Sequence, residues 1–223
     1  MTHTTTVLVV GGGGTGTGTA RDLAARGIDV TLVERGGLAS GTSGRSHGLL
    51  HSGARYAESD PDGAVECRDE NEILRRIGGH CVDDTGGLFL QLDADDSGYF
   101  REKLDACHEC GIDATVIDGD EARARVPDLS DAVVRAMVVP DAVVYPSRLT
   151  AANAESAADH GATIYTDAPV ENIVVADEEI DRVEIGGDVA TDIQAEYVVN
   201  ATGPWADEVG ALAGVDFDMK PTK

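Results

Sequence analysis

One glycine-rich stretch decides the fold, Gly11-Gly12-Gly13-Gly14-Thr15-Gly16. It follows an apolar run rich in β-branched residues, 4–10, which is typical of a buried strand. After it, residues 19–27 show the apolar spacing of a helix, and residues 29–34 form a second strand-like run. A strand, a glycine-rich turn, a helix and a second strand in this order predict a βαβ unit with two parallel strands.

The glycine spacing fits the pattern G-x-G-x-x-G of dinucleotide-binding proteins. Gly11 would permit the tight turn, Gly13 the approach of a pyrophosphate, and Gly16 the close packing of helix on strand. Gly14 would begin the helix, whose amide hydrogens favour an anion. Glu34 ends the second strand, where a carboxylate can accept hydrogen bonds from ribose hydroxyls and would repel the 2′-phosphate of NADP. The motif alone does not separate FAD from NAD, and a glycine turn that packs helix on sheet without a ligand is the alternative.

The rest of the chain continues to alternate strand and helix, which predicts an α/β fold. Residues 36–56 are rich in Gly, Ser and Thr and predict a long loop of the kind that is usually functional. Asp118 and Glu121 predict a capping box, and Ser147 is expected to cap a helix that runs to His160. Two further helices are expected at 63–77 and 99–110, and strands at 87–92, 133–139, 143–145, 163–165, 169–175, 182–185 and 197–200.

The chain is strongly acidic, with 223 residues, 41 Asp and Glu against 17 Lys and Arg, and a formal net charge of −24. Such a surface disfavours nucleic acid and anionic membranes as partners. No apolar stretch approaches the roughly 18 residues of a membrane helix, and no signal-peptide pattern is present, so we expect a soluble globular protein. Because salt screens the mutual repulsion of the carboxylates, the composition favours adaptation to a salt-rich, halophilic cytoplasm; an ordinary acidic protein is the alternative.

The four cysteines, Cys67, Cys81, Cys107 and Cys110, are too few for a disulfide framework and indicate reduced thiols in a cytoplasm. Cys107 and Cys110 have a metal-like spacing, but no second pair follows. Phe100, Leu104 and Cys107 share one face of a predicted helix, so a buried helix face is favoured and no metal site is predicted.

Four sequence segments together resemble the FAD-dependent glycerol-3-phosphate dehydrogenases, within the wider D-amino-acid-oxidase-like flavoenzyme family. They are most similar to the catalytic chain of the anaerobic, three-subunit type. The segments are RSHGLLHSGARY at 45–56, GLF at 87–89, RLTAAN at 148–153 and VVNATGPW at 198–205. The resemblance implies a Rossmann-type FAD-binding domain interleaved with a mixed-sheet substrate domain.

The resemblance implies FAD as the cofactor and adds further residues to its site. The hydroxyls and small glycines at 42–48 suit a loop that lies along the pyrophosphate and ribityl chain, and in the family the backbone after this loop passes beside the flavin ring. Val170 falls where the family contacts the adenine through its backbone, and Thr202 and Gly203 end a strand beside the glycine turn. The residues implied in addition to the glycines and Glu34 are Arg35, Thr42, Ser43, Arg45, Ser46, Gly48, Leu49, Val170, Thr202, Gly203 and Trp205.

The resemblance also implies the reaction. It is the oxidation of sn-glycerol 3-phosphate to dihydroxyacetone phosphate by hydride transfer to flavin N5, with electrons passed to a quinone through membrane-associated partner subunits. Arg55 and Tyr56 match positions that bind the substrate phosphate, a task that suits the paired donors of arginine; a surface ion pair is the alternative for Arg55. His51 could orient the flavin, take the C2 hydroxyl proton or be a hydrogen-bonded core histidine.

The domain order of the family assigns residues 1–80 and 147–214 to the FAD domain, and 81–146 and 215–223 to an incomplete substrate domain. We therefore expect a truncated fragment of a hetero-oligomeric enzyme that is cytoplasmic and peripheral at the inner face of the membrane. Two other hypotheses stay open. One is a related FAD-dependent enzyme that oxidises an amino acid or a 2-hydroxy acid, and the other is a non-catalytic nucleotide-binding subunit.

Overall fold

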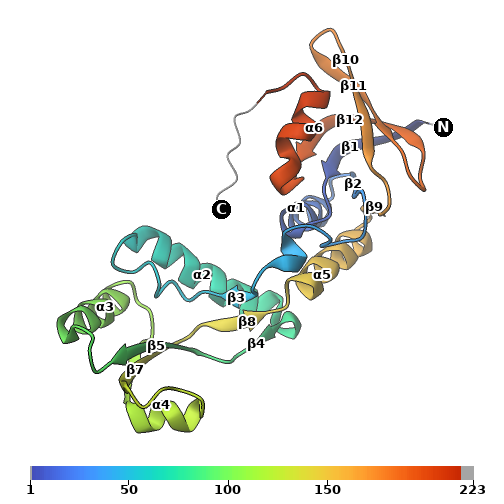
Figure 1. Ribbon diagram of the computed structural model, residues 1–223. Helices are drawn as coiled ribbons and strands as arrows, with labels where there is room; N and C mark the ends of the chain where they lie inside the picture. The colour runs from blue at the N-terminus through green and yellow to red at the C-terminus, as the bar shows by residue number, and fades with distance from the viewer. Residues whose placement is uncertain (1, 217–223) are drawn as a thin grey trace. The chain divides into compact units, whose positions relative to one another are not determined.

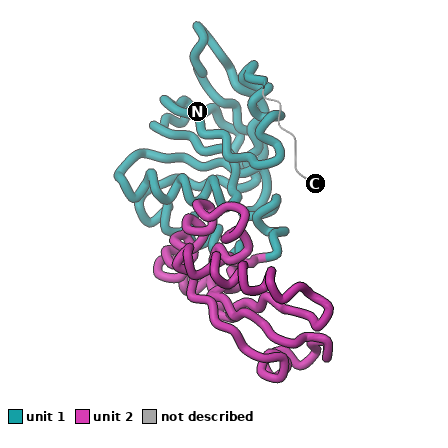
Figure 2. The backbone as a smooth tube through the Cα atoms, turned by 90° about the vertical axis from the view of Figure 1, so that its left-hand side faces the viewer, with its two compact units in different colours: residues 1–47, 146–223 teal, residues 48–145 magenta. Residues whose placement is uncertain are grey.

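The computed structural model describes residues 2–216, and the chain divides into two compact units (Figure 2). Unit 1 comprises residues 1–47 and 146–223, and unit 2 comprises residues 48–145. Unit 1 is therefore built from two segments of the chain, with the whole of unit 2 inserted between them in the sequence. The interruption of one unit by the other agrees with an interleaved α/β fold.

The core of unit 1 is a six-stranded mixed sheet with the order β10-β11-β12-β1-β2-β9 (Figure 1). The strand β1 pairs in parallel with β2 and β12, as the βαβ pattern predicts, and β2 pairs in parallel with β9. The two remaining pairs, β10 with β11 and β11 with β12, are antiparallel. The strands are β1 Thr2–Val10, β2 Val30–Val33, β9 Thr163–Tyr165, β10 Val170–Ala176, β11 Glu179–Ile185 and β12 Thr191–Asn200.

The alternating side chains of β1 separate two apolar cores, one on each face of this sheet. Val7 and Val9 pack with helices α1 (Gly14–Ala25) and α5 (Pro146–Asp159). Leu8 and Val10 pack on the other face with the antiparallel strands and with helix α6 (Ala206–Leu212). Burial on both faces explains why the strand reads as a continuous apolar run.

Unit 2 contains two small antiparallel sheets and three helices. The first sheet has the order β3-β8-β4 and the second β5-β7-β6. Helices α2 and α3 pack against β7 around a core that includes Ala64, Phe100, Cys107 and Met137. The elements are β3 Leu49–Leu50, α2 Pro61–Ile77, β4 Val82–Asp83, β5 Gly87–Leu92, α3 Ser97–Glu109, β6 Thr115–Asp118, α4 Gly119–Arg125, β7 Val133–Val139 and β8 Ala142–Val144.

The first domain boundary differs from the expected one. From the sequence we expected the FAD domain to continue to residue 80, whereas unit 2 begins at residue 48. The reason is that Ala64 of α2 shares one core with Cys107 and Met137, so α2 belongs with the later helices and strands. The binding role of each unit stays a prediction, and most of the expected segment 215–223 lies outside the described residues.

Most local predictions are confirmed, with one correction. The capping box is present, since Asp118 accepts from the Glu121 amide at 2.9 Å and Glu121 accepts from the Asp118 amide at 3.2 Å. The prediction that Ser147 caps a helix is wrong, because α5 already begins at Pro146. Proline suits a first helical position, where its missing N–H has no partner to lose. The strands β3, β4 and β6 and the helix α6 were not predicted from the sequence.

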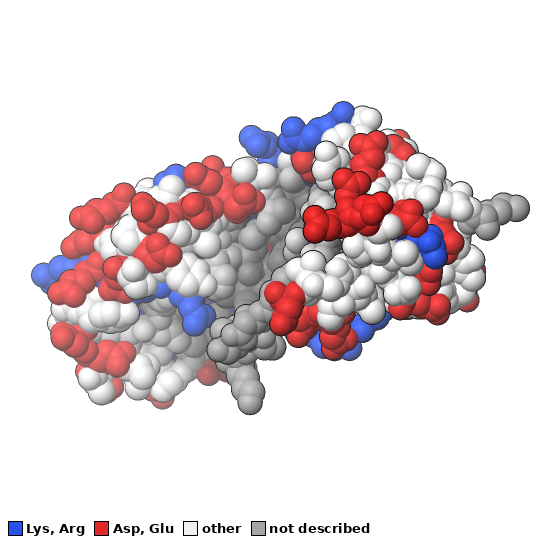
Figure 3. Space-filling model, turned by 90° about the horizontal axis from the view of Figure 1, so that it is seen from above, with Lys and Arg blue, Asp and Glu red and all other residues white. Residues whose placement is uncertain are grey.

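The predicted buried helix face is confirmed, since Phe100 and Cys107 of α3 are both buried. Cys107 and Cys110 are buried, and all four cysteines are free thiols. Within residues 2–216, no group of three or more His, Cys, Asp or Glu side chains has the geometry of a metal site. None of the helices in that range is both long and apolar enough to cross a bilayer. On the face drawn in Figure 3, acidic side chains cover more of the surface than those of Lys and Arg do.

Candidate functional site

The glycine turn lies between β1 and the amino end of α1, and two of its glycines are required by close backbone contacts. Gly11 has a φ of +115°, and a Cβ atom there would lie 2.5 Å from the Ala201 carbonyl oxygen. A Cβ atom at Gly16 would lie 1.9 Å from the Gly11 carbonyl oxygen. No other residue type leaves the turn and the helix this close together, as the predicted pattern requires.

The amino end of α1 is open to an anion. Its N-cap is Gly13, which has no side chain, and the helix contains no acidic residue in its first turn. The Gly14 amide donates to the Ser43 hydroxyl at 2.9 Å, which draws the loop of residues 40–45 alongside the turn. The helix dipole therefore faces a space lined by amide and hydroxyl donors, which is the chemistry of a phosphate site.

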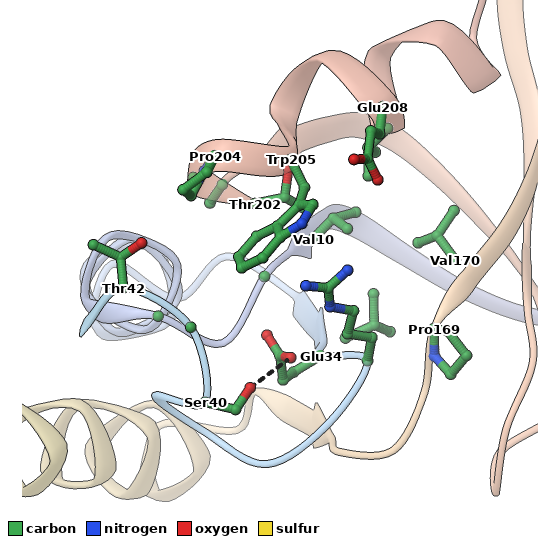
Figure 4. A pocket seen from close by; sticks show the side chains of 18 of the residues that line it. Val10, Glu34, Ser40, Thr42, Pro169, Val170, Thr202, Pro204, Trp205 and Glu208 are labelled. Carbon is green, nitrogen blue, oxygen red and sulfur yellow. Dashed lines mark hydrogen bonds between the residues drawn. The ribbon is translucent and has the colours of Figure 1, made fainter. Parts of the chain in front are cut away.

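Glu34 is fixed at the end of β2 by the backbone around it. Its Oε2 accepts from the Gly12 amide at 2.6 Å, and its Oε1 accepts from the Gly36 amide at 3.0 Å and from the Ser40 hydroxyl at 3.5 Å (Figure 4). These bonds aim a charged acceptor at the glycine turn. A carboxylate has about four acceptor positions, and three are used here, so about one remains for a hydroxyl of a ligand.

The opposite side of this space is formed by the end of β12 and the residues that follow it. Gly203 has a φ of +59° at the start of a short 3₁₀ turn, Gly203–Trp205. The Arg35 guanidinium lies 4.0 Å from the centroid of the Trp205 ring. A Cβ atom at Gly41 would come within 3.2 Å of that same ring, so the loop after β2 packs closely on the indole.

These elements enclose a pocket of about 980 Å³ in unit 1, drawn in Figure 4. It is at the upper end of the sizes that small-molecule and cofactor sites have. Arg45 lines the pocket and also donates to the carbonyls of Ser40 and Gly41, which stabilises the loop. The predicted residues that line the pocket are Gly11, Gly13, Gly14, Glu34, Arg35, Thr42, Ser43, Arg45, Val170, Thr202, Gly203 and Trp205.

Two predicted residues of unit 1 do not line this pocket. Gly16 lies beneath the turn, and Ser46 lies just beyond the 3₁₀ turn Ser43–Arg45. The sequence reasoning missed the contribution of α6, from which Glu208, Val209 and Leu212 line the pocket. This helix could have been predicted from the sequence, because Val209 and Leu212 have helical apolar spacing shortly after the VVNATGPW motif.

The other predicted residues lie in unit 2. Gly48 precedes β3 and Leu49 is the first residue of that strand, and the loop that follows carries His51, Arg55 and Tyr56. The His51 and Tyr56 rings meet edge to face at 5.9 Å. Arg55 is exposed and lines a second pocket, of about 440 Å³, whose walls lie entirely in unit 2. The candidate base and the two candidate phosphate-binding residues therefore share one loop.

The glycine turn, the acidic end of β2 and the pocket beside them define a dinucleotide-binding protein of the α/β class. The chain belongs to the FAD dependent oxidoreductase family, whose model matches residues 6–223.

Its relatives include the A1 chain of the anaerobic glycerol-3-phosphate dehydrogenase of Haloferax volcanii, which is 51% identical over 100% of this chain and 40% of its own length. The corresponding chain of the anaerobic enzyme from Escherichia coli K12 is 43% identical over 97% of this chain and 41% of its own length. The chain thus spans about two fifths of these curated relatives. Among solved structures, L-proline dehydrogenase from P. horikoshii superposes with a TM-score of 0.82 and 26% identity, over 99% of this chain and 58% of the other.

Proposed function

We propose that the protein holds FAD in the pocket of unit 1. The adenosine ribose would bind at Glu34, and the pyrophosphate at the amides and hydroxyls around Gly13, Gly14 and Ser43. The residues present fit such a group, since a Cβ atom at Gly13 would lie 3.1 Å from the Ser43 hydroxyl and narrow the space at the turn. Bound flavin supplies the electron-accepting chemistry.

We further propose that the protein contributes to the oxidation of sn-glycerol 3-phosphate to dihydroxyacetone phosphate. The observation that carries this proposal is the 51% identity, along the whole chain, to part of a glycerol-3-phosphate dehydrogenase. Arg55 would bind the phosphate through its paired donors, with Tyr56 beside it. His51, next to Tyr56, is the candidate to take the C2 hydroxyl proton, because an imidazole nitrogen can act as a general base.

The partners and the cellular location follow from the same proposal. Electrons would pass to a quinone through membrane-associated partner subunits of a hetero-oligomer. The protein would then be cytoplasmic and peripheral at the inner face of the membrane, bound through those subunits.

The test uses the protein with whatever sequence the gene encodes beyond residue 223. Loaded with FAD and mixed with glycerol 3-phosphate in the absence of oxygen, it should lose its flavin absorbance and then reduce a dye acceptor. Glycerol without the phosphate should act poorly. Arg55→Met should raise the KM for glycerol 3-phosphate, whereas Arg125→Met, an exposed arginine of α4, should not. Failure of the FAD-loaded protein to reduce the dye would refute the proposal.

A second candidate function is the oxidation of an amino acid or a 2-hydroxy acid. The structural similarity to L-proline dehydrogenase favours it, and arginine binds carboxylates as well as phosphates. Competition between glycerol 3-phosphate and a set of carboxylate substrates separates the two candidates. Turnover of the carboxylates with no inhibition by glycerol 3-phosphate would select the second.

We also propose that the acidic surface is an adaptation to high salt. At a net charge of −24, repulsion between carboxylates destabilises the folded chain until salt screens it. The free energy of unfolding should therefore rise from dilute buffer to about 1 M salt, where the Debye length is about 3 Å. A chain that is equally stable without added salt would contradict this adaptation.

A further inference from the structure

Three side chains on one face of α3, and that of Cys110 directly after the helix, contact a single short loop, residues 54–58, which carries Arg55 and Tyr56. The Tyr99 hydroxyl and the Lys103 ammonium both donate to Glu58 Oε2, at 3.2 and 2.8 Å. Further along the helix, the Cys107 thiol lies 4.0 Å from the Ala54 carbonyl oxygen.

The fourth contact joins the Cys110 thiol to the Ala57 carbonyl oxygen at 3.9 Å. Positions three and four apart share one face of a helix, which places all four side chains in a row. The row therefore contacts the loop on both sides of Arg55 and Tyr56.

The Lys103–Glu58 pair is the most buried ion pair among the described residues. The Lys103 side chain is 8% exposed and that of Glu58 is 27% exposed, against 67% and 62% for Arg26 and Asp22. The ammonium also lies 5.3 Å from the centroid of the Phe89 ring. Lysine is almost never this buried unless it is paired, so the ammonium and the Glu58 carboxylate hold each other in place.

We propose that Lys103 is a positioning residue, which fixes the loop at Glu58 and thereby directs Arg55 and Tyr56. Arg55 and Lys103 line the same pocket of unit 2, so a shift of the loop would move the guanidinium relative to that pocket. The role of Arg55 in phosphate binding rests on the proposed function. The fixing of the loop by α3 does not.

The first experiment measures the fixing of the loop without any assumption about activity. Cys107 and Cys110 lie beneath the loop and are 0% and 5% exposed, so the rate at which a thiol reagent labels them reports opening of this region. Lys103→Met should raise that labelling rate by about tenfold, because we expect loss of the ion pair to make the equilibrium for closing of this region about tenfold less favourable. Lys103→Arg should keep it close to the wild-type rate.

Cys81 is the internal control, because it is buried in unit 2 outside the core that packs beneath the loop. Its labelling, resolved by mass spectrometry, should not change in Lys103→Met. Equal acceleration at Cys81 would mean that the substitution loosens the whole unit, and unchanged labelling at Cys107 and Cys110 would mean that the loop is held by other contacts. Either result overturns the proposal. Should Lys103→Met fail to fold, Glu58→Gln serves as the second variant with the same expected pattern.

The second experiment measures positioning in the FAD-loaded protein. Lys103→Met should raise the KM for glycerol 3-phosphate by about tenfold and lower kcat by less than about threefold, with unchanged FAD content. Lys103→Arg should restore the KM, and the surface variant Arg26→Met should match the wild type. An unchanged KM in a variant with a loosened loop would overturn the positioning role. Absence of turnover in the wild type would refute the proposed function alone, since the labelling result would stand.

Discussion

In unit 1 the predicted cofactor residues are held chiefly by the backbone, whereas in unit 2 the loop with the candidate substrate residues is held by side chains of two helices. The turn in unit 1 depends on the approach of Gly16 to the Gly11 carbonyl, and two amides hold Glu34. In unit 2, Asn71 of α2 anchors the chain at residues 50 and 51, and Lys103 of α3 anchors the loop of residues 54–58 that follows.

The helix α2 anchors residues 50 and 51 through the buried side-chain amide of Asn71. The Asn71 Nδ2 donates to the carbonyls of Leu50 and His51 at 3.2 Å each and to that of Pro140 at 3.4 Å. The Asp141 carboxylate, also buried, accepts from the Ser52 amide at 2.7 Å. We therefore expect that a single added Cβ atom is enough to disrupt the site in unit 1. In unit 2, each substitution should remove only one of the several contacts that hold the chain.

The largest effect is expected from Gly16→Ala, because the new Cβ atom would lie 1.9 Å from a backbone oxygen that cannot move alone. We expect at least about a 100-fold loss of FAD affinity and a destabilisation of about 3 kcal/mol, measured by flavin titration and urea unfolding.

The matched control for that variant is Gly18→Ala in the same helix. A Cβ atom there meets nothing closer than the Asn153 side chain at 4.0 Å. Since alanine is the better helix former, this variant should keep FAD and gain up to about 1 kcal/mol. Equal losses in both variants would mean that helix composition, rather than the close approach, controls the site.

The next prediction concerns the stability of unit 2. Asn71→Leu keeps the size of the side chain and removes a donor from the carbonyls of Leu50, His51 and Pro140. The expected cost is about 3 kcal/mol in the free energy of unfolding, since Asn71 is only 3% exposed. FAD affinity should stay within about threefold of the wild type, because the pocket of unit 1 contains no residue of unit 2 among those described.

Asn172→Ala is the control for this change. Asn172 lies on the edge strand β10, where its amide donates to Glu184 at 3.2 Å in an exposed position. Its loss should change stability by less than about 0.5 kcal/mol. A simultaneous loss of FAD in Asn71→Leu would mean that FAD binding depends on the fold of unit 2 as well as on the pocket of unit 1.

The same contrast explains how much of the site could be predicted from the sequence. Gly11, Gly16 and Glu34 were predictable because a backbone that must pass close to itself, or to a phosphate, allows few residue types and leaves a fixed spacing. The anchors Asn71 and Lys103 were not predicted. Each is one polar residue on an amphipathic helix, and its partners lie far away in sequence, so nothing in the local pattern separates it from a solvated side chain. The boundary at residue 48 was not predicted either. It depends on Ala64 and Cys107 sharing one core, and these residues lie far apart in the sequence.

A smaller effect is expected from Glu34→Gln in unit 1. The substitution keeps one oxygen but removes the charge that accepts from the Gly12 and Gly36 amides. Hydrogen bonds to charged groups contribute about 1.5–3 kcal/mol. A weaker bond to a proposed ribose hydroxyl should therefore lower FAD affinity by about 10- to 100-fold, and the weakened bonds from the two amides should also lower the free energy of unfolding. Glu208→Gln changes another carboxylate that lines the pocket and should cost less than about threefold. Similar losses in the two variants would indicate a general effect of charge in the pocket rather than a specific bond.

The smallest effect comes from the buried thiol beneath the loop. Burial raises the pKa of Cys107 above its ordinary value of 9.0. Between about pH 9 and that raised pKa, the unfolded chain therefore releases this proton while the folded chain keeps it, and stability falls with at most about 1.36 kcal/mol per pH unit. Below this range the thiol makes no difference to the pH dependence.

Cys107→Val removes the titrating group and isolates this effect. The difference in unfolding free energy between wild type and variant should be constant from about pH 6 to 8 and should change above about pH 9 in favour of the variant. All four cysteines lie in unit 2, so FAD affinity should show no corresponding difference between the two proteins at alkaline pH. Parallel stability curves up to about pH 10.5 would mean that the thiol ionises as easily in the folded chain as in the unfolded one. We expect otherwise, because the Cys107 thiol is completely buried beside the Ala54 carbonyl.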